Sequence, residues 1–259
     1  LCEDGTVNSI RLPGNGLNGA LPEGLGHLTR LTRLDLGFNE LTGTVPESWY
    51  TLPLEWLILE NNQVSGTISE SIGNLENISL INFGSNDFSG TIPAVLGESS
   101  ALAGIVLAKN NLSGSIPTEL GKLVGPDIDF VIIELDHNSL TGAIPSELGL
   151  LSDTLIDLVL DHNFLNGTIP EELYQCKSLE LLSLSSNELT GPISTGIGNW
   201  KNLHTFNVDD NKLTGPIPAE IAGLPSLMNV RLSGNMFDGP VDLCPTQTWL
   251  DAELWADCK

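Results

Sequence analysis

Apolar and polar residues along this chain follow one pattern that returns about every 24 residues. Its clearest copies read LTRLDLGFNELTGTVP at 31–46, LEWLILENNQVSGTIS at 54–69 and LHTFNVDDNKLTGPIP at 203–218. Leucines that flank a single residue, such as Leu34 and Leu36, have the period of a short strand with one buried face. A lone strand of this length cannot bury that face, so the pattern predicts stacked coils whose strands form a parallel sheet.

An asparagine follows each predicted strand, at intervals of 23 to 28 residues. The ten positions are Asn15, Asn39, Asn62, Asn86, Asn110, Asn138, Asn163, Asn187, Asn211 and Asn235. Because a buried amide must be paired, we expect a ladder in which each side chain bonds to the backbone of adjacent coils. The glycine four residues later, and the proline that often follows, predict a tight bend and only short helices on the back. The 28-residue step from Asn110 to Asn138 predicts a loop around Val124 to Asp129, with the sheet unbroken at Ile133.

These residues resemble the plant-specific class of leucine-rich repeats, whose mark is the L-x-G-x-I-P extension after the asparagine, and the resemblance covers residues 7–241. It implies an α/β fold, a right-handed solenoid of ten coils with a concave parallel sheet, a second short sheet, and short 3-10 or α helices on the convex side. It also implies a role in extracellular recognition. We divide the chain into a solenoid at 1–241, with an incomplete N-terminal cap at 1–6, and a C-terminal cap at 242–259. The pattern is similar to the ectodomains of plant receptor kinases and, in its ten repeats, to polygalacturonase-inhibiting proteins.

The cysteines and the glycosylation sequons both favour the secretory pathway. Cys244 and Cys258 lie beyond the last repeat, where a solenoid needs a cap, and we expect a disulfide between them, which implies an oxidising compartment. Cys2 resembles the second cysteine of an N-terminal cap, whose usual partner would precede Leu1, and Cys176 is interpreted as a small core residue. Sequons begin at Asn77, Asn111 and Asn166. The start at Leu1 lacks a signal peptide and is interpreted as a mature or trimmed end.

The net charge of -23 argues against nucleic acid or an anionic membrane as partner. No apolar run approaches the roughly 18 to 20 residues needed to cross a bilayer, so we expect no membrane insertion of this segment. The acidity fits solubility and habitat, and a cationic partner is the alternative.

Catalytic motifs are nearly absent, and the sequence predicts a protein that is not an enzyme and needs no cofactor. The segment at 14–19 matches G-x-G-x-x-G, but no long helix follows it, so a dinucleotide site is not expected. The duplicated tripeptides Asp136-His137-Asn138 and Asp161-His162-Asn163 are the exception. In consecutive coils their carboxylates and imidazoles would be neighbours and could hold a divalent cation. The plainer alternative is a common variant of the turn before the asparagine.

The predicted ligand-binding face follows from the frame of the repeat. Counting the asparagine as zero, positions minus six, minus four and minus two point out of the concave sheet. Apolar residues at these positions form a stripe over the middle coils: Trp56, Ile58, Leu80, Val106, Ile132, Val159 and Leu181. Exposed apolar residues with a charged rim usually mark an interface, although Val and Ile are also frequent on any strand. The acidic residues Glu60, Glu134 and Asp157 lie beside the stripe and would select basic groups on the partner.

We therefore predict a secreted, non-enzymatic recognition module that binds a protein or peptide with basic flanks on its concave face. Two alternatives remain: a structural subunit of an extracellular assembly or coat, which would self-associate through its terminal coils, and an inhibitor of a secreted hydrolase. The incomplete N-terminal cap favours the first alternative, because it would leave the edge of the first strand unpaired.

Overall fold

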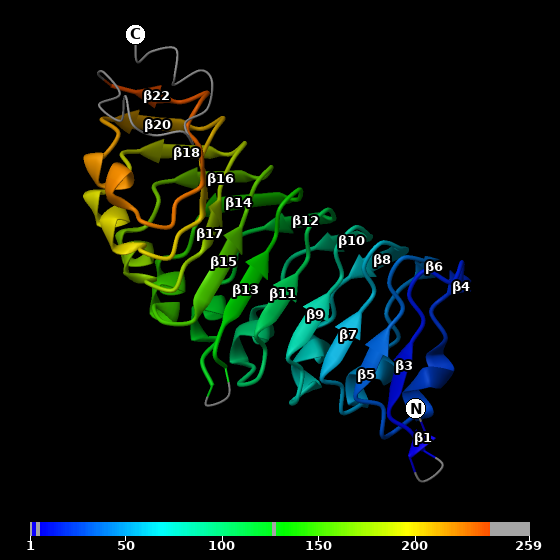
Figure 1. Cartoon of the computed structure of the whole chain (residues 1–259). Helices are drawn as coiled ribbons and strands as arrows, with labels where there is room; N and C mark the ends of the chain where they lie inside the picture. The colour runs from blue at the N-terminus through cyan, green and yellow to red at the C-terminus, as the bar shows by residue number, and fades with distance from the viewer. Residues whose placement is uncertain (1, 4–5, 126–127, 239–259) are drawn as a thin grey trace.

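The computed structural model describes residues 2–3, 6–125 and 128–238. The chain forms a curved solenoid in which each coil contributes one strand to an inner sheet and one strand to a second sheet (Figure 1). A short 3-10 helix then lies on the opposite side of most coils. The predicted solenoid with a ten-stranded parallel sheet is confirmed.

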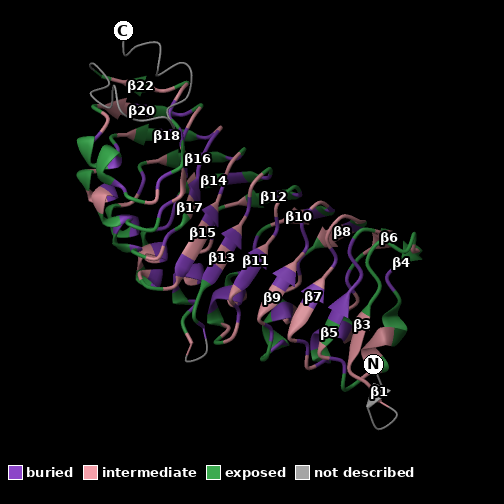
Figure 2. Cartoon of the chain, in the orientation of Figure 1, coloured by how far each residue is buried: buried purple, intermediate pink, exposed green. Residues whose placement is uncertain are grey.

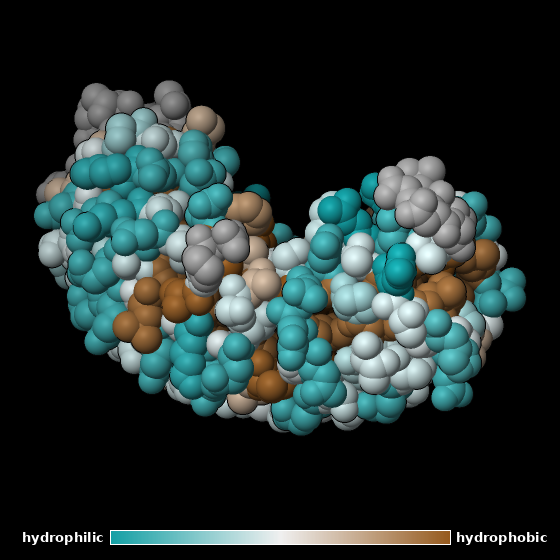
Figure 3. All heavy atoms as spheres, turned by 90° about the horizontal axis from the view of Figure 1, so that it is seen from below, coloured by the Kyte–Doolittle hydropathy of each residue, from teal (hydrophilic) through white to brown (hydrophobic). Residues whose placement is uncertain are grey.

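The inner sheet is parallel throughout. Its strands, in spatial order, are β3 (Ser9–Arg11), β5 (Arg33–Asp35), β7 (Trp56–Ile58), β9 (Leu80–Asn82), β11 (Gly104–Val106), β13 (Val131–Glu134), β15 (Leu155–Val159), β17 (Leu181–Ser183), β19 (Thr205–Asn207) and β21 (Asn229–Arg231). This sheet faces the hollow of the arc, which Figure 3 shows in profile from its lower edge.

The second sheet is also parallel and is formed by the residues after each asparagine. Its strands are β4 (Asn18–Ala20), β6 (Glu40–Gly43), β8 (Gln63–Thr67), β10 (Asp87–Gly90), β12 (Asn111–Gly114), β14 (Ser139–Ala143), β16 (Phe164–Gly167), β18 (Glu188–Gly191), β20 (Lys212–Gly215) and β22 (Met236–Phe237). A separate antiparallel pair, β1 (Cys2–Glu3) and β2 (Thr6–Val7), precedes the first coil.

Nine 3-10 helices occupy the back of the described coils. They are η1 (Glu23–His27), η2 (Glu47–Thr51), η3 (Glu70–Asn74), η4 (Ala94–Glu98), η5 (Thr118–Lys122), η6 (Ser146–Leu151), η7 (Glu171–Gln175), η8 (Thr195–Asn199) and η9 (Ala219–Gly223). In seven of them the residue before the helix is a proline in an extended conformation, for example Pro46 with φ -64° and ψ 135°. Proline fixes φ there and lacks the N–H that the first turn would leave unpaired, so it starts a short helix.

One apolar core runs the length of the solenoid between these layers. From β5 to β21, each inner strand carries buried apolar residues, as in Leu57 and Ile81, which appear in purple along the sheet in Figure 2. Trp49 and Trp200 are the largest fully buried side chains and come from the back of their coils. The core is continuous because each coil buries its apolar face against the next one.

The asparagine ladder is present as predicted. The Nδ2 of Asn62 donates to the carbonyl oxygens of Leu36, 3.0 Å away, and Leu59, 2.9 Å away, and its Oδ1 accepts from the backbone N–H of Leu41 at 2.9 Å. The same bonds recur in the following coils, where the asparagines are buried. Each amide therefore satisfies backbone groups of two coils.

Two of the glycines that follow the asparagines show why a side chain is unfavourable at this position. Gly66 and Gly191 have φ of 89° and 77°, a region that favours glycine. In addition, a Cβ on Gly66 would lie 2.8 Å from Cγ2 of Thr44, and one on Gly191 would lie 2.8 Å from Cγ2 of Thr168. At these two positions a threonine methyl group of one coil packs directly against the glycine of the next coil.

Two irregular coils leave the inner sheet continuous. After the 28-residue step, β13 pairs with β11 and β15, so the sheet is unbroken at Ile133 as predicted. Val124 and Asp129 of the predicted loop are exposed, and residues 126–127 of that loop lie outside the described part. The register between β13 and β15 shifts after Val131, and this shift accommodates the extra residue Ile156 of the 25-residue step.

Candidate binding face

Two rows of side chains point out of the inner sheet over the middle coils. The register places Trp56, Leu80, Gly104, Ile132, Asp157 and Leu181 side by side in one row. It places Ile58, Asn82, Val106, Glu134, Val159 and Ser183 side by side in the other. The seven predicted apolar residues are all half-buried. Polar residues and a glycine separate several of them, so the face is an alternating apolar and polar surface and not an unbroken apolar stripe.

Leu80 closes the gap that Gly104 leaves in the first row. Its Cδ1 lies 2.6 Å from the position that a Cβ on Gly104 would occupy. The leucine therefore leans over the glycine of the next coil, toward Ile132, which follows in the same row. A larger residue at position 104 would push this side chain back, so the glycine shapes the face.

Trp56 has a partner that sequence reasoning missed. The guanidinium carbon of Arg33 lies 4.6 Å from the centroid of the indole ring, and Nε of Arg33 is 3.2 Å from a carboxylate oxygen of Glu55. Arg33 precedes Trp56 in the same row of the sheet, which is the signal that could have found the pair. One face of the indole is thus held by a cation–π contact, and the ring is pre-oriented at one end of the apolar residues.

The carboxylates on this face crowd one another. Burial, followed by the neighbouring Asp136, Asp157 and Glu60, raises the pKa of Glu134. Burial and Glu180 raise the pKa of Asp157. In the described part of the chain, Glu60, Glu134 and Asp157 take part in no ion pair, although Oε2 of Glu60 accepts from Nδ2 of Asn82 at 3.0 Å. The face therefore holds negative charge that no lysine or arginine of these coils neutralises.

The two Asp-His-Asn tripeptides lie side by side, but their four side chains do not converge as one set of metal ligands. Nδ1 of His137 is 2.9 Å from Oδ2 of Asp136, and the rings of His137 and His162 are in contact, with centroids 4.2 Å apart and planes tilted by 39°. Asp161 instead accepts from Oγ of Ser183 and from the backbone N–H of Ser185, both at 2.7 Å. Burial raises the pKa of Asp161 against these bonds. Among the described residues, no group of three or more His, Cys, Asp and Glu side chains is arranged to hold a metal ion.

Both histidines occupy a backbone position with a special conformation. The residue before each ladder asparagine has a positive φ, and His137 and His162 have values of 52° and 51°. Other coils place Phe38, Asn61, Ser85, Lys109, Ser186, Asp210 or a glycine there. The left-handed turn is thus a property of every coil, and the histidine pair is a particular choice of side chain at two adjacent coils.

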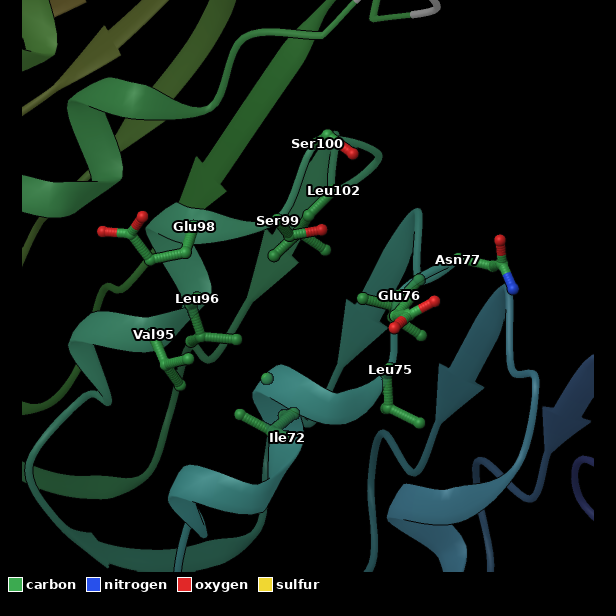
Figure 4. Close-up of a pocket in the computed structure, with 12 residues that line it drawn as sticks. Ile72, Leu75, Glu76, Asn77, Val95, Leu96, Glu98, Ser99, Ser100 and Leu102 are labelled. Atoms are coloured by element: carbon green, nitrogen blue, oxygen red, sulfur yellow. The ribbon is translucent and has the colours of Figure 1, made fainter.

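The three sequon asparagines have exposed side chains. Asn111 and Asn166 lie in the second sheet, in β12 and β16. Asn77 follows η3 at the rim of a cleft of about 380 Å³ that is also lined by Leu75, Glu76 and Val95 (Figure 4). Exposure is compatible with glycosylation, which stays a prediction at all three sites.

The cysteines divide into one described thiol and three that the structure leaves untested. Cys176 is a free, buried residue, and burial raises the pKa of its thiol to about 12. This agrees with its interpretation as a small core residue. Cys2 lies in β1, and the predicted disulfide between Cys244 and Cys258 lies outside the described residues, as does the predicted cap at 242–259. Over residues 2–3, 6–125 and 128–238, the structure contains no helix with the length and apolar character of a membrane span.

Sequence comparisons identify the repeat. The family model described as Leucine Rich Repeat matches residues 30–52, 53–75, 178–200 and 202–224. A probable LRR receptor-like serine/threonine-protein kinase of Arabidopsis thaliana is 43% identical over 58 residues, which are 22% of this chain and 6% of the kinase. The match to this kinase thus covers repeats and a small part of its length.

Solved structures show the same fold over most of the chain. The ectodomain of the receptor kinase GASSHO1/SCHENGEN3 from Arabidopsis thaliana, in complex with CASPARIAN STRIP INTEGRITY FACTOR 2, superposes with a TM-score of 0.85 and 37% identity. This match covers 91% of the present chain and 28% of the other. The Arabidopsis receptor kinase HAESA, in complex with the peptide hormone IDA and the co-receptor SERK1, superposes with a TM-score of 0.77 and 31% identity, covering 89% and 42%. The chain therefore spans less than half the length of these ectodomains, one of which binds a peptide hormone and a co-receptor.

Proposed function

Because the chain is a plant-type leucine-rich-repeat protein that resembles receptor-kinase ectodomains, we propose that it is an extracellular, non-enzymatic recognition module. Its concave face binds an extended peptide or protein segment in which basic residues flank an apolar stretch. The relatives supply the class of ligand, and the residues of this face supply its chemistry.

One observation carries the proposal: half-buried apolar side chains and unneutralised carboxylates share the rows of the inner sheet. Val106 lies beside Glu134, which lies beside Val159, and Ile132 lies beside Asp157. The core does not need apolar residues here, because the buried side chains of the same strands already fill it. Crowded carboxylates with raised pKa values are unfavourable for the isolated protein and mark functional surfaces.

A partner with apolar and basic groups relieves both unfavourable features. Apolar groups of a peptide that lie over Leu80, Val106 and Val159 would remove exposed hydrophobic surface from water. A lysine or arginine beside Glu134 or Asp157 would neutralise the desolvated charge and steer the encounter. The net charge of -23 adds a long-range negative potential that also attracts a basic partner.

The carboxylates of the face act as binding groups in this proposal, and neither they nor the adjacent histidines act as catalysts. The His137 ring contacts Asp136 and His162, and Asp161 is held by Ser183 and Ser185. The Ser183 hydroxyl donates to Asp161, but the histidine pair contacts Asp136 instead, so a nucleophile, a base and an orienting group do not form one connected set.

Matched peptides test the proposal. A library of extended peptides with an apolar centre and Arg or Lys flanks is compared by calorimetry with the same centres carrying Glu or Asp flanks. We expect only the basic series to bind, and we expect Trp56→Ala to cost about 2 kcal/mol or more in binding if the indole is a hot spot. Val106→Glu should also block binding, because it removes apolar contact in the middle of the face.

The control is folding: both variants must keep the wild-type thermal transition, since both side chains lie outside the core. Equal affinity for the two peptide series would contradict the proposed role of the carboxylates. Binding that neither substitution weakens would show that the interface lies outside the concave face. Light scattering over a range of protein concentrations separates this module, which stays monomeric, from the structural-subunit alternative, which associates.

A further inference from the structure

The two adjacent histidines, His137 and His162, have a geometry that the peptide-binding role does not use. His137 and His162 occupy the same frame position in adjacent coils, their ring centroids are 4.2 Å apart, and both side chains are exposed. The described part of the chain gives the His162 ring no hydrogen bond, and its ring partner is His137. Two imidazoles are thus presented together at the rim of the inner sheet.

A carboxylate orients the first imidazole. Oδ2 of Asp136 lies 2.9 Å from Nδ1 of His137, so a proton on Nδ1 leaves the lone pair on Nε2, which is free to coordinate. A ligating histidine commonly uses its second nitrogen in this way, because the hydrogen bond fixes the tautomer and the direction of the ring. Asp136 therefore acts as an orienting group and not as a metal ligand, which explains why the four-residue arrangement suggested by the tripeptides does not form.

We propose that His137 and His162 form an open site for a transition-metal ion such as Zn²⁺, Ni²⁺ or Cu²⁺. The two Nε2 atoms supply the protein ligands, and water completes the coordination. Imidazole nitrogens suit these ions, whereas Ca²⁺ prefers six to eight oxygen ligands. In a tetrahedral site with Zn–N bonds of about 2.0–2.1 Å the two nitrogens are roughly 3.3 Å apart. Rings whose centroids are 4.2 Å apart can reach this separation by rotation of the His162 side chain.

The charges around the pair are mixed, with acidic groups in excess. Asp136 and Asp161 precede the two histidines, Glu134 lies on β13, and Asp210 lies two coils further along the row. Ser186 is the neighbour of His162 on one side, and Lys109 is the neighbour of His137 on the other. The positive charge of Lys109 opposes metal binding, so its removal should strengthen binding at the histidine pair. A metal ion attracted to the acidic surface in general would not depend on this one position.

Metal titrations of the EDTA-treated, dialysed protein test the site. We expect ZnCl₂, NiCl₂ and CuCl₂ each to bind with one ion at the histidine pair and to raise the melting temperature by mass action. CaCl₂ should not bind at the pair. Binding should weaken on acidification, because protons compete with the metal for the imidazole nitrogens.

Asparagine is the matched replacement, because Asn61 occupies the same backbone position with φ 53° in another coil. His137→Asn together with His162→Asn should lower the affinity for Ni²⁺ at least about tenfold, and Asp136→Asn should lower it roughly tenfold through loss of ring orientation. Lys109→Ser introduces the residue that Ser85 provides at the same position with φ 54°, and it should raise the affinity. His204→Asn, which alters a histidine outside the pair, should change nothing.

The electron paramagnetic resonance spectrum of bound Cu²⁺ should show coupling to two imidazole nitrogens in the wild type and lose it in the double variant. Metal bound by cysteines or carboxylates elsewhere would persist in the double variant and would overturn the assignment. Absence of binding by all three transition ions at millimolar concentration would also overturn it. Neither result depends on a peptide ligand, so the test is independent of the proposed recognition function.

Discussion

The guanidinium of Arg33 lies over the indole of Trp56, with 4.6 Å between the guanidinium carbon and the ring centroid. The two residues are neighbours across β5 and β7, and Glu55 forms an ion pair with the arginine. The ring is therefore fixed on the surface by another surface residue and not by the core.

This pairing predicts that Trp56→Ala changes stability little. Loss of an exposed cation–π contact costs about 1 kcal/mol or less. Trp49→Ala is the matched comparison, because Trp49 is fully buried and its Nε1 donates to the carbonyl oxygen of Pro22. Its loss should cost about 3–5 kcal/mol. Thermal unfolding of the two variants checks the difference, and similar losses would place Trp56 in the core.

Internal rungs of the asparagine ladder should contribute more to stability than the terminal rung. Asn138→Ala leaves the backbone N–H of Leu112 without its partner, whereas the carbonyls of Leu107 and Leu135 keep the Nδ2 groups of Asn110 and Asn163. One buried unpaired group costs about 1–3 kcal/mol, so the loss of stability should lie in this range.

The control for the ladder is Asn15→Ala. Asn15 is exposed and its Nδ2 donates to the carbonyl of Pro13, so the loss should stay within about 1 kcal/mol. Urea unfolding with unchanged m-values measures both. Equal losses at the two positions would show that the ladder contributes no more inside the solenoid than at its end.

The contact between Gly191 and Thr168 predicts a cost for the smallest side chain. Gly191→Ala forces a methyl group toward Cγ2 of Thr168 at a φ of 77°, and should destabilise the protein by more than about 1 kcal/mol. Gly223→Ala is the control, since no atom lies within 4 Å of a Cβ there. Adding Thr168→Ser to Gly191→Ala removes the opposing methyl and should recover part of the loss. Chemical denaturation of the three variants decides whether crowding contributes beyond backbone strain.

Mild acidification should stabilise the fold through the concave carboxylates. Burial and neighbouring carboxylates raise the pKa of Glu134 above its ordinary 4.5, so the folded state binds its proton more readily than the unfolded state. The stability contributed by this group is therefore present below pH 4.5 and is lost as the pH rises through the raised pKa.

Glu134→Gln removes this dependence. The variant should melt at a higher temperature than the wild type at pH 7, and the difference should shrink as the pH falls toward 4.5. Melting curves across this window test the prediction, and Glu40→Gln, on an exposed position of β6, serves as the control. A variant that melts lower than the wild type at pH 7 would mean that Glu134 is paired and stabilising.

The sequence by itself determined the number of coils, the position of each inner strand and the asparagine ladder. These features follow from residues within one repeat: Leu34 and Leu36 define a buried strand face, and Asn39 follows it at a fixed distance. Repetition supplies the rest, because a coil that cannot bury its apolar face alone must stack on a similar one. The unbroken sheet at Ile133 follows from the same local pattern.

Only the tertiary structure decided which side chains meet across coils. Arg33 over Trp56, Leu80 over Gly104 and Ser183 bonded to Asp161 join residues 22 to 24 positions apart, and the direction of each side chain depends on register and curvature. The extra residue Ile156 changes the register at β15. The length of this repeat shows that one residue is inserted, but it does not show where the insertion lies. The two Asp-His-Asn tripeptides show the same limit. Their spacing brings the histidines together, whereas Asp136 turns to its own histidine and Asp161 to the serines of the next coil, because hydrogen bonds to near neighbours compete with a shared site.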